Sequence, residues 1–235
     1  MKTIKIAAIA TLLGSSALAL GTTAHADTAS TAESNNHIIF KANTNPTNPV
    51  DPTDPSNPNP PNPVDPTDPG NPGTGNEGPL SIDYVSNIEF GEHEITSGTQ
   101  IYNAQNENPF VQVSDNRGTG AGWTLSATAS KFASEDGSKE LKGAELSFKN
   151  GEVKTKPNNV SKEAVHHDVT FNNSDAKVLM DAGVDAGRGT WIDVFSGEAG
   201  NNDKIQLKVL EGSADAGVDY TATINWELAD APNNK

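Results

Sequence analysis

Short runs in which apolar and polar residues alternate recur along the chain from residue 80 onward. In residues 123–129, tryptophan, leucine and alanine alternate with threonine and serine, and residues 205–209 alternate isoleucine, leucine and valine with glutamine and lysine. A period of two places every second side chain on the same face of a strand. The remaining runs lie at residues 82–90, 110–113, 144–148, 169–171, 191–195 and 222–228. The pattern therefore predicts a chain built mainly of strands.

Turn-forming residues separate these runs. Asp136-Gly137 and Asn150-Gly151 are dipeptides typical of hairpin turns and loops. Helical periodicity is weak throughout, and only residues 175–183 are expected to hold one short helical turn. Seven or more short strands in about 155 residues predict an all-β fold, either a β-sandwich or a related antiparallel barrel with long loops. We assign this domain to residues 80–235.

A tract rich in proline, asparagine and aspartate precedes the domain at residues 45–79. The segment NPVDPTDPSNP begins at Asn48, and NPVDPTDPGNP begins fourteen residues later at Asn62. Proline removes amide donors and fixes φ, which favours an extended polyproline-II conformation. At ~3.1 Å per residue the straight tract would span on the order of 100 Å. Its composition predicts a linker or loop without a core of its own, and a spacer is the simplest interpretation.

Residues 27–44 form a leader that contains one short apolar patch, Asn36–Lys41. The patch is short enough for a single strand. If that strand pairs with the main domain, the proline-rich tract becomes a long loop inside one fold. If it does not pair, residues 27–79 are a disordered leader. We favour pairing.

The first 26 residues have the three parts of a secretory signal peptide. Lys2 and Lys5 are basic, an apolar stretch follows at residues 6–20, and Ala24-His25-Ala26 is a small-residue cleavage site. The mature chain is therefore expected to start at Asp27. No second hydrophobic run and no sortase-type motif occurs in the sequence. We therefore expect no membrane insertion, and we expect any attachment to a surface to be non-covalent.

Cysteine content and net charge exclude further sources of stability and further classes of binding partner. The chain has no cysteine, so its stability outside the cell must come from packing. The formal net charge is −15, and removal of the two lysines of the signal peptide brings it to −17. A strongly acidic surface argues against nucleic acid and anionic lipid as partners.

The pattern Trp-x-Leu occurs twice, as Trp123-Thr124-Leu125 and as Trp226-Glu227-Leu228. In a strand, tryptophan and leucine of each copy share one face, and the residue between them faces the other way. Each motif extends an apolar stripe, which normally packs in a core. In the alternative interpretation, an indole ring lines a groove for a glycan or a peptide.

The flanks of the two motifs make them specific. Five blocks follow one another in a characteristic order: LSIDYVSNIEFG at 80–91, residues 111–130, LKGAELSFKNG at 141–151, GRGTWIDVF at 187–195 and YTATINWELADAP at 220–232. In these blocks, and in its VDPTDP repeat, the chain resembles the WxL domain family. The resemblance implies a β-rich domain that Gram-positive bacteria export and that binds peptidoglycan or another wall glycan non-covalently. It also implies an alternative, a structural subunit of a surface complex that grips another exported wall protein.

The two motifs and two arginines are the candidate ligand-binding residues. They are Trp123, Leu125, Trp226, Leu228, Arg117 and Arg188. Both arginines lie in glycine-flanked loops just before a tryptophan-bearing segment. A guanidinium can pair with both oxygens of a carboxylate, and wall peptides carry carboxylates. In the alternative interpretation each arginine braces a turn or pairs with an internal acid.

Catalysis, metals and cofactors are not expected. Glu89, Glu92 and Glu94 cluster near the first strand, but no pattern selects a pair of carboxylates placed for glycoside hydrolysis. His166 and His167 are adjacent, so on a strand they face opposite ways and cannot share one metal ion. We therefore expect a binding protein without enzymatic activity.

Overall fold

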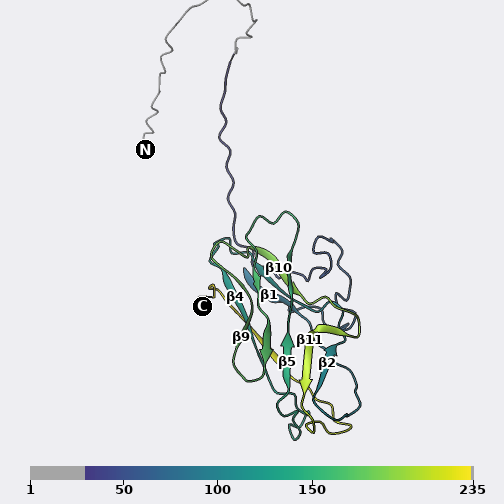
Figure 1. The fold of residues 1–235 in the computed structure, drawn as a ribbon. Helices are drawn as coiled ribbons and strands as arrows, with labels where there is room; N and C mark the ends of the chain where they lie inside the picture. The colour runs from purple at the N-terminus through teal and green to yellow at the C-terminus, as the bar shows by residue number, and fades with distance from the viewer. Residues whose placement is uncertain (1–29, 234–235) are drawn as a thin grey trace, which may run out of the picture. The chain divides into compact units, whose positions relative to one another are not determined.

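The fold consists of antiparallel strands and connecting loops (Figure 1). The computed structural model describes residues 30–233, so the predicted signal peptide at 1–26 lies outside the described residues. Within this range twelve strands form three sheets of four strands each. No helix is present in the described part of the chain. The prediction of an all-β fold is confirmed.

Each sheet combines strands that are far apart in the sequence. The first sheet has the order β1 (Leu80–Val85), β3 (Phe110–Asp115), β10 (Gly189–Val194) and β6 (Glu152–Thr155). The second has the order β2 (Gln100–Ala104), β11 (Asn202–Val209), β5 (Glu145–Phe148) and β8 (Val169–Phe171). The third has the order β12 (Ile224–Ala229), β4 (Trp123–Ala129), β9 (Lys177–Ala182) and β7 (Val165–His166). The two Trp-x-Leu strands, β4 and β12, are therefore neighbours in one sheet.

The register between β4 and β12 sets the two motifs beside each other. Leu125 lies opposite Leu228, and Trp226 lies opposite Ala127. Strand β4 is central and buries its alternate side chains, whereas β12 is at the edge of the sheet and its inward side chains are only half-buried. The first copy of the motif therefore lies in a buried central strand, and the second copy lies in a half-buried edge strand.

One main hydrophobic core draws on all three sheets. Val111 of β3, Ile205 of β11 and Leu179 of β9 belong to the same buried cluster as Trp123 and Leu125. Burial of a large apolar side chain stabilises a fold by about 1.5–3 kcal/mol relative to its exposure. Because the cluster is shared, each sheet depends on the other two for the burial of its inner face.

Strand β9 corrects one prediction. Residues 175–183 were expected to hold a helical turn, but Lys177–Ala182 is a strand that pairs with β4. The register shifts between Leu125 and Ser126 of β4, which lie opposite Met180 and Val178. Leu179 is therefore an extra residue on β9, and a bulge of this kind interrupts the period-two pattern.

The proline-rich tract packs on the domain and is not the extended spacer that its composition predicts. Val50 is only 6% exposed and belongs to a second buried cluster with Tyr84, Phe110 and residues of β10. Val64, the equivalent residue of the second repeat copy, packs against the same cluster. The fourteen-residue repeat thus supplies the same apolar contact twice, and the tract is a loop of the fold.

Aspartates fix the turns of both repeat copies. Asp51 Oδ1 accepts hydrogen bonds from the Thr53 amide at 2.8 Å and the Thr53 hydroxyl at 2.7 Å. Asp65 Oδ1 accepts one from the Thr67 amide at 2.9 Å, and its Oδ2 accepts one from Asn106 Nδ2 at 3.0 Å. Such side-chain acceptors satisfy the backbone amides two residues further on, which fixes each turn without a strand or helix partner.

Gln112 of β3 joins the tract to the first sheet. Its side chain is fully buried. Its Oε1 accepts a hydrogen bond from the Val50 amide at 2.8 Å, and its Nε2 donates to the Asn48 carbonyl at 3.1 Å and to Asp83 Oδ2 at 2.9 Å. Burial raises the pKa of Asp83 despite its hydrogen bonds from Ser114, Ser81 and Gln112. The tract is therefore held through a buried polar network.

We expect Gln112→Ala to loosen the tract. The substitution leaves the Val50 amide without its buried partner and removes one of the three side-chain hydrogen bonds to Asp83. The expected cost is about 2–3 kcal/mol in the free energy of unfolding. Hydrogen exchange at the Val50 amide should accelerate more than exchange in the main core. The matched control is Gln105→Ala, because the Gln105 side chain is exposed. Unchanged exchange at Val50 in the Gln112 variant would contradict the assigned network.

The leader differs from the pairing that we favoured. Residues 37–41 contain no strand, and Ile38, Ile39 and Phe40 are 71%, 72% and 86% exposed. The described residues up to Ile39 belong to a unit separate from the one that begins at Phe40. The tract is a loop because of its own contacts and not because a strand before it closes the fold.

Candidate functional site

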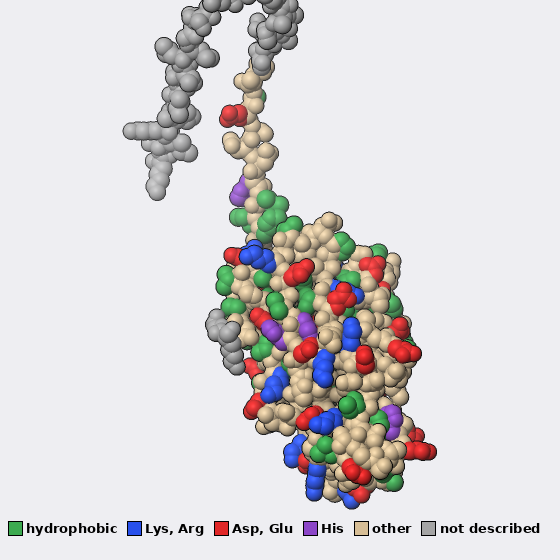
Figure 2. All heavy atoms as spheres, viewed as in Figure 1, with side chains coloured by type: hydrophobic (Ala, Val, Ile, Leu, Met, Phe, Trp, Pro, Cys, Tyr) green, Lys and Arg blue, Asp and Glu red, His purple; other side chains and the backbone are tan. Residues whose placement is uncertain are grey.

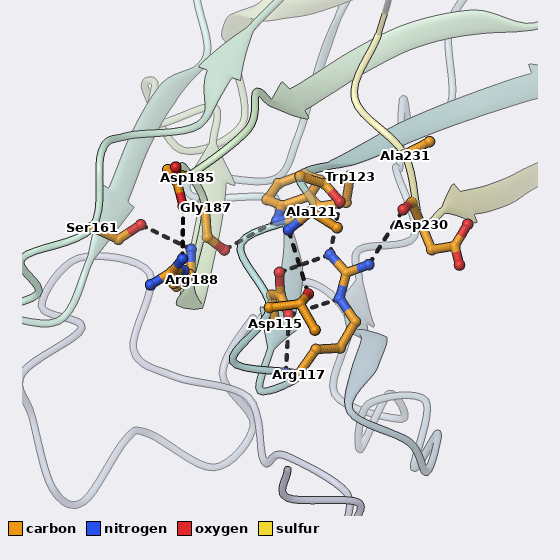
Figure 3. Close-up of polar contacts among 12 residues, drawn as sticks. Asp115, Arg117, Ala121, Trp123, Ser161, Asp185, Gly187, Arg188, Asp230 and Ala231 are labelled. Carbon is orange, nitrogen blue, oxygen red and sulfur yellow. Dashed lines mark hydrogen bonds and ion pairs between the residues drawn. The ribbon is translucent and has the colours of Figure 1, made fainter. Parts of the chain in front are cut away.

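The first Trp-x-Leu motif lies inside the protein. Trp123 and Leu125 have no exposed surface. The indole Nε1 of Trp123 donates a hydrogen bond to the Gly187 carbonyl at 3.0 Å (Figure 3). Gly187 has a φ of 69°, and a Cβ there would lie 2.5 Å from the indole nitrogen, so glycine is required beside the ring. Both motif residues contribute packing and offer a ligand no accessible surface.

Arg117 ties together the ends of the two motif strands (Figure 3). Its Nε and Nη2 donate to the Asp115 carboxylate at 2.9 and 2.8 Å, and Nη2 also donates to the Gly122 carbonyl at 2.7 Å. Nη1 reaches the Asp230 carbonyl, just after β12, at 3.3 Å. The hydrogen bonds that Arg117 donates to Asp115 raise the pKa of Arg117, whose side chain is only 13% exposed. Its geometry favours the bracing role over contact with a ligand.

Arg188 has a more accessible guanidinium. Its side chain is 45% exposed, and Nη2 donates to Asp185 Oδ1 at 2.8 Å (Figure 3). Its amide donates to Ser161 Oγ at 3.0 Å, and its carbonyl accepts a bond from Trp191 Nε1 at 3.0 Å. Exposed pairs of this kind contribute only about 0–1 kcal/mol, so the guanidinium can exchange partners. A ligand role for Arg188 stays a prediction.

The second Trp-x-Leu motif lies at the protein surface. Trp226 and Leu228 are half-buried against the main core, and Glu227 between them is exposed. Because β12 is at the edge of its sheet, no further strand within residues 30–233 pairs with it on its outer side. Of the two tryptophans that sequence reasoning singled out, only Trp226 can combine packing with contact to a ligand.

Trp226 lines a groove of about 1190 Å³. The lining comes mainly from two long loops, residues 85–98 between β1 and β2 and residues 209–224 between β11 and β12. Leu207 of β11 and Leu146 of β5 add apolar surface from the second sheet. Pockets for small molecules are usually about 300–1,000 Å³, so this groove has room for an oligosaccharide or a peptide segment.

Aromatic rings are prominent in the lining of the groove. The five rings, all half-buried, are Phe90, Tyr102, Phe132, Tyr220 and Trp226. Phe90 and Phe132 meet edge to face with centroids 6.3 Å apart, and Tyr102 stacks on His93 at 4.1 Å. Half-buried rings are held in place on one side and leave surface for a ligand on the other.

Carboxylates outnumber the other ionisable side chains in the lining of the groove. Its lining contains six carboxylates and no lysine or arginine; the acids are Glu89, Glu92, Glu94, Glu211, Asp215 and Asp219. By contrast, acidic and basic side chains are interspersed over the face of the described residues that Figure 2 shows. The lining of the groove is therefore more uniform in charge than this face as a whole.

The family of the chain follows from a comparison with known proteins. A family model described as WxL domain surface cell wall-binding matches residues 27–232. The chain belongs to this family. No curated protein and no solved structure matches the chain. The WxL domain places the protein among the surface proteins that bind the cell wall.

The WxL domain as matched includes the proline-rich tract. This agrees with the contacts that Val50, Val64 and Gln112 make, since those contacts place the tract inside the folded unit. Among residues 30–233, no segment forms a helix of the length and hydrophobicity that a membrane span requires.

The two adjacent histidines of the WxL domain, His166 and His167, pair with separate acids. His166 Nδ1 lies 2.8 Å from Asp193 Oδ2, and its Nε2 lies 2.9 Å from Asp168 Oδ1. His167 contacts Asp181 instead. Within the part of the chain that the structure describes, no group of three or more histidines, cysteines or acids is arranged to hold a metal ion.

The two loops of the groove were not singled out from the sequence. The one available indication was the cluster of Glu89, Glu92 and Glu94, which we considered only as candidate catalytic acids. The second loop lies more than a hundred residues further along the chain, and only the pairing of β2 with β11 brings it near the first. The structure therefore unites Trp226 with residues that no local motif connects.

Proposed function

We propose that this chain is exported by Gram-positive bacteria and holds to peptidoglycan non-covalently through the groove, without catalysing a reaction. The membership of the WxL family supports attachment to the wall. The groove lined by Trp226 is the observation that carries the proposal, because it joins the family motif to a space large enough for a polymer segment. The signal-peptide pattern at residues 1–26 supports export.

The chemistry of the lining suits a glycan strand. The C–H face of a pyranose ring is apolar and stacks on an aromatic ring, which removes water from both surfaces. Half-buried Trp226 and Tyr102 offer such surfaces. The carboxylates around them accept hydrogen bonds from hydroxyl and amide groups. Together these groups bind a sugar polymer by contact alone.

We expect Trp226→Ala to weaken binding to purified Gram-positive sacculi by about 10- to 30-fold. Loss of an aromatic anchor at the centre of an interface typically costs about 1.5–2 kcal/mol, which corresponds to this range. The measurement is a pull-down of the chain from Asp27 onward at increasing sacculus concentration. Circular dichroism checks that each variant is folded.

The matched control is Val160→Ala, because Val160 is 99% exposed and is not part of the groove. Its binding should equal that of the unchanged chain. If the unchanged chain stays in the supernatant at physiological salt, direct attachment to peptidoglycan is wrong. If it binds and Trp226→Ala binds equally well, the groove is not the site.

The free edge of β12 favours a second function. In the third sheet β12 pairs only with β4, and its outward residues Asn225, Glu227 and Ala229 are exposed. The unpaired backbone groups of an edge strand accept a strand from another chain. The protein would then be a subunit of a surface complex that reaches the wall through a partner wall protein. In that case sacculi alone retain little of it, and addition of the co-exported partner restores retention.

A further inference from the structure

We propose that the groove recognises the free primary amino groups of wall peptides, in their ammonium form, next to the glycan that stacks on its rings. This inference rests on the proposed function, because it names the part of peptidoglycan that the same groove takes. It follows from the charge of the lining and from the position of the aromatic rings.

The lining departs from the average of the chain. The whole sequence contains 16 basic and 31 acidic residues, so a surface of this size would ordinarily include some lysine or arginine. The groove includes none, although six carboxylates line it. The lining holds no permanently charged cation, since His93 is its one basic side chain, and this is the feature that a cationic ligand requires.

Most of these carboxylates have no internal cation. Asp215 pairs with Lys139, which lies outside the lining, at 3.0 Å. The other ion pairs within residues 30–233 do not involve the remaining five acids of the groove. Their negative potential therefore remains directed at the solvent of the groove and at any ligand there.

The two loops carry equal shares of the acids. Glu89, Glu92 and Glu94 come from the loop between β1 and β2, and the other three come from the loop between β11 and β12. A cleft lined by one sign of charge with apolar material beneath it concentrates the field inside the cleft. An ammonium group is attracted into such a groove, and a phosphate group is repelled from it.

The aromatic rings act with the acids on the same cation. The face of an indole or phenol ring attracts an ammonium group at about 6 Å or less. Trp226 and Tyr102 are half-buried in the lining, so their rings are fixed beside the acidic loops. The groove thus combines stacking surface for sugar with carboxylates for an amine, which matches peptidoglycan with uncrosslinked amino groups better than phosphate-rich wall polymers.

The test compares native sacculi with sacculi whose free amines have been acetylated. Acetylation removes the positive charge and leaves the glycan strands intact. We expect the chain from Asp27 onward to bind acetylated sacculi at least 10-fold more weakly at low salt. The same loss is expected on native sacculi for the triple variant Glu92→Gln, Glu94→Gln and Asp219→Asn.

The matched control is a second triple variant, Glu135→Gln, Glu163→Gln and Asp203→Asn. These three acids are exposed and lie outside the lining, and their removal changes the net charge by the same amount. Binding of this variant to native sacculi should not fall. Equal behaviour of the two triple variants would show that only net charge matters and would overturn the inference.

Sacculi stripped of teichoic acids distinguish the source of the amine, since those polymers also carry amino groups. Binding should persist after stripping; a loss there would assign the ligand to teichoic acid and overturn the inference. If native and acetylated sacculi are bound equally, attachment to peptidoglycan stands and recognition of an amine fails. If native sacculi are not bound at all, the proposed function fails and this inference fails with it.

Discussion

Trp123→Ala is expected to lower the free energy of unfolding by about 3–5 kcal/mol, the usual cost of truncating a large aromatic residue in a core. Trp123 has no exposed surface, and its indole nitrogen bonds the Gly187 carbonyl. The substitution leaves a cavity among strands of the third sheet and a carbonyl without its donor. Urea unfolding followed by circular dichroism measures the loss without relying on tryptophan fluorescence.

Trp226→Ala is the matched comparison, because it removes the same side chain from the second copy of the motif. Trp226 is half-buried on an edge strand. Its truncation should cost about 1–2 kcal/mol, less than the loss at Trp123, because less apolar surface is uncovered. Equal losses from the two variants would contradict the different environments of the two motifs.

The stability of the domain is expected to fall as the pH rises above about 6.5. His166 is hydrogen-bonded to Asp193, which is completely buried, and to Asp168. Burial alone would lower the pKa of His166, but its bonds to the two aspartates outweigh burial and raise this pKa above the ordinary value of 6.5. The folded chain therefore holds the proton more tightly than the unfolded chain.

The sign of the effect follows from linkage. Because the pKa of His166 is raised by folding, its stabilising contribution is complete below about pH 6.5. That contribution disappears as the pH rises through the folded pKa. Burial also raises the pKa of Asp193, whose Oδ1 has no hydrogen-bond partner among the described residues. The raised pKa values of His166 and Asp193 therefore both mean that folding favours retention of the proton between them.

His166→Asn tests the role of this histidine. At pH 6 the variant should be less stable by about 2–4 kcal/mol, since it leaves a buried carboxylate without its cation. Urea unfolding at pH 6 and pH 9 should show a clear loss of stability with pH in the unchanged chain and a much smaller one in the variant. His37→Asn is the control, because His37 is exposed. A pH dependence that survives in the His166 variant would refute this assignment.

The sequence predicts strands best where one face is buried and the register is regular. Strands β4, β11 and β12 alternate as expected because each has one inward and one outward face. Strand β9 escapes the pattern, since its bulge places Leu179 and Met180 in succession and buries both. A local pattern cannot show a bulge that is defined by the partner strand.

The packing of the proline-rich tract could not be predicted from its amino-acid composition either. Each repeat copy has a single apolar residue, Val50 or Val64, too few to predict a core. The fourteen-residue spacing was the available indication, because both valines reach one cluster on the first sheet. Arg117 is similar, since its acceptor at Asp230 is far away in sequence. Contacts of this range depend on the complete topology.

Because the proline-rich tract is packed on the domain, it must be included in any fusion protein that carries this domain. A chimera that begins at Leu80 would expose Tyr84 and Phe110, which Val50 helps to cover, and would leave Gln112 without two of its partners. Such a shortened module would expose additional apolar surface to solvent and would aggregate more readily. A portable wall-attachment module should therefore start no later than Phe40, where the folded unit begins.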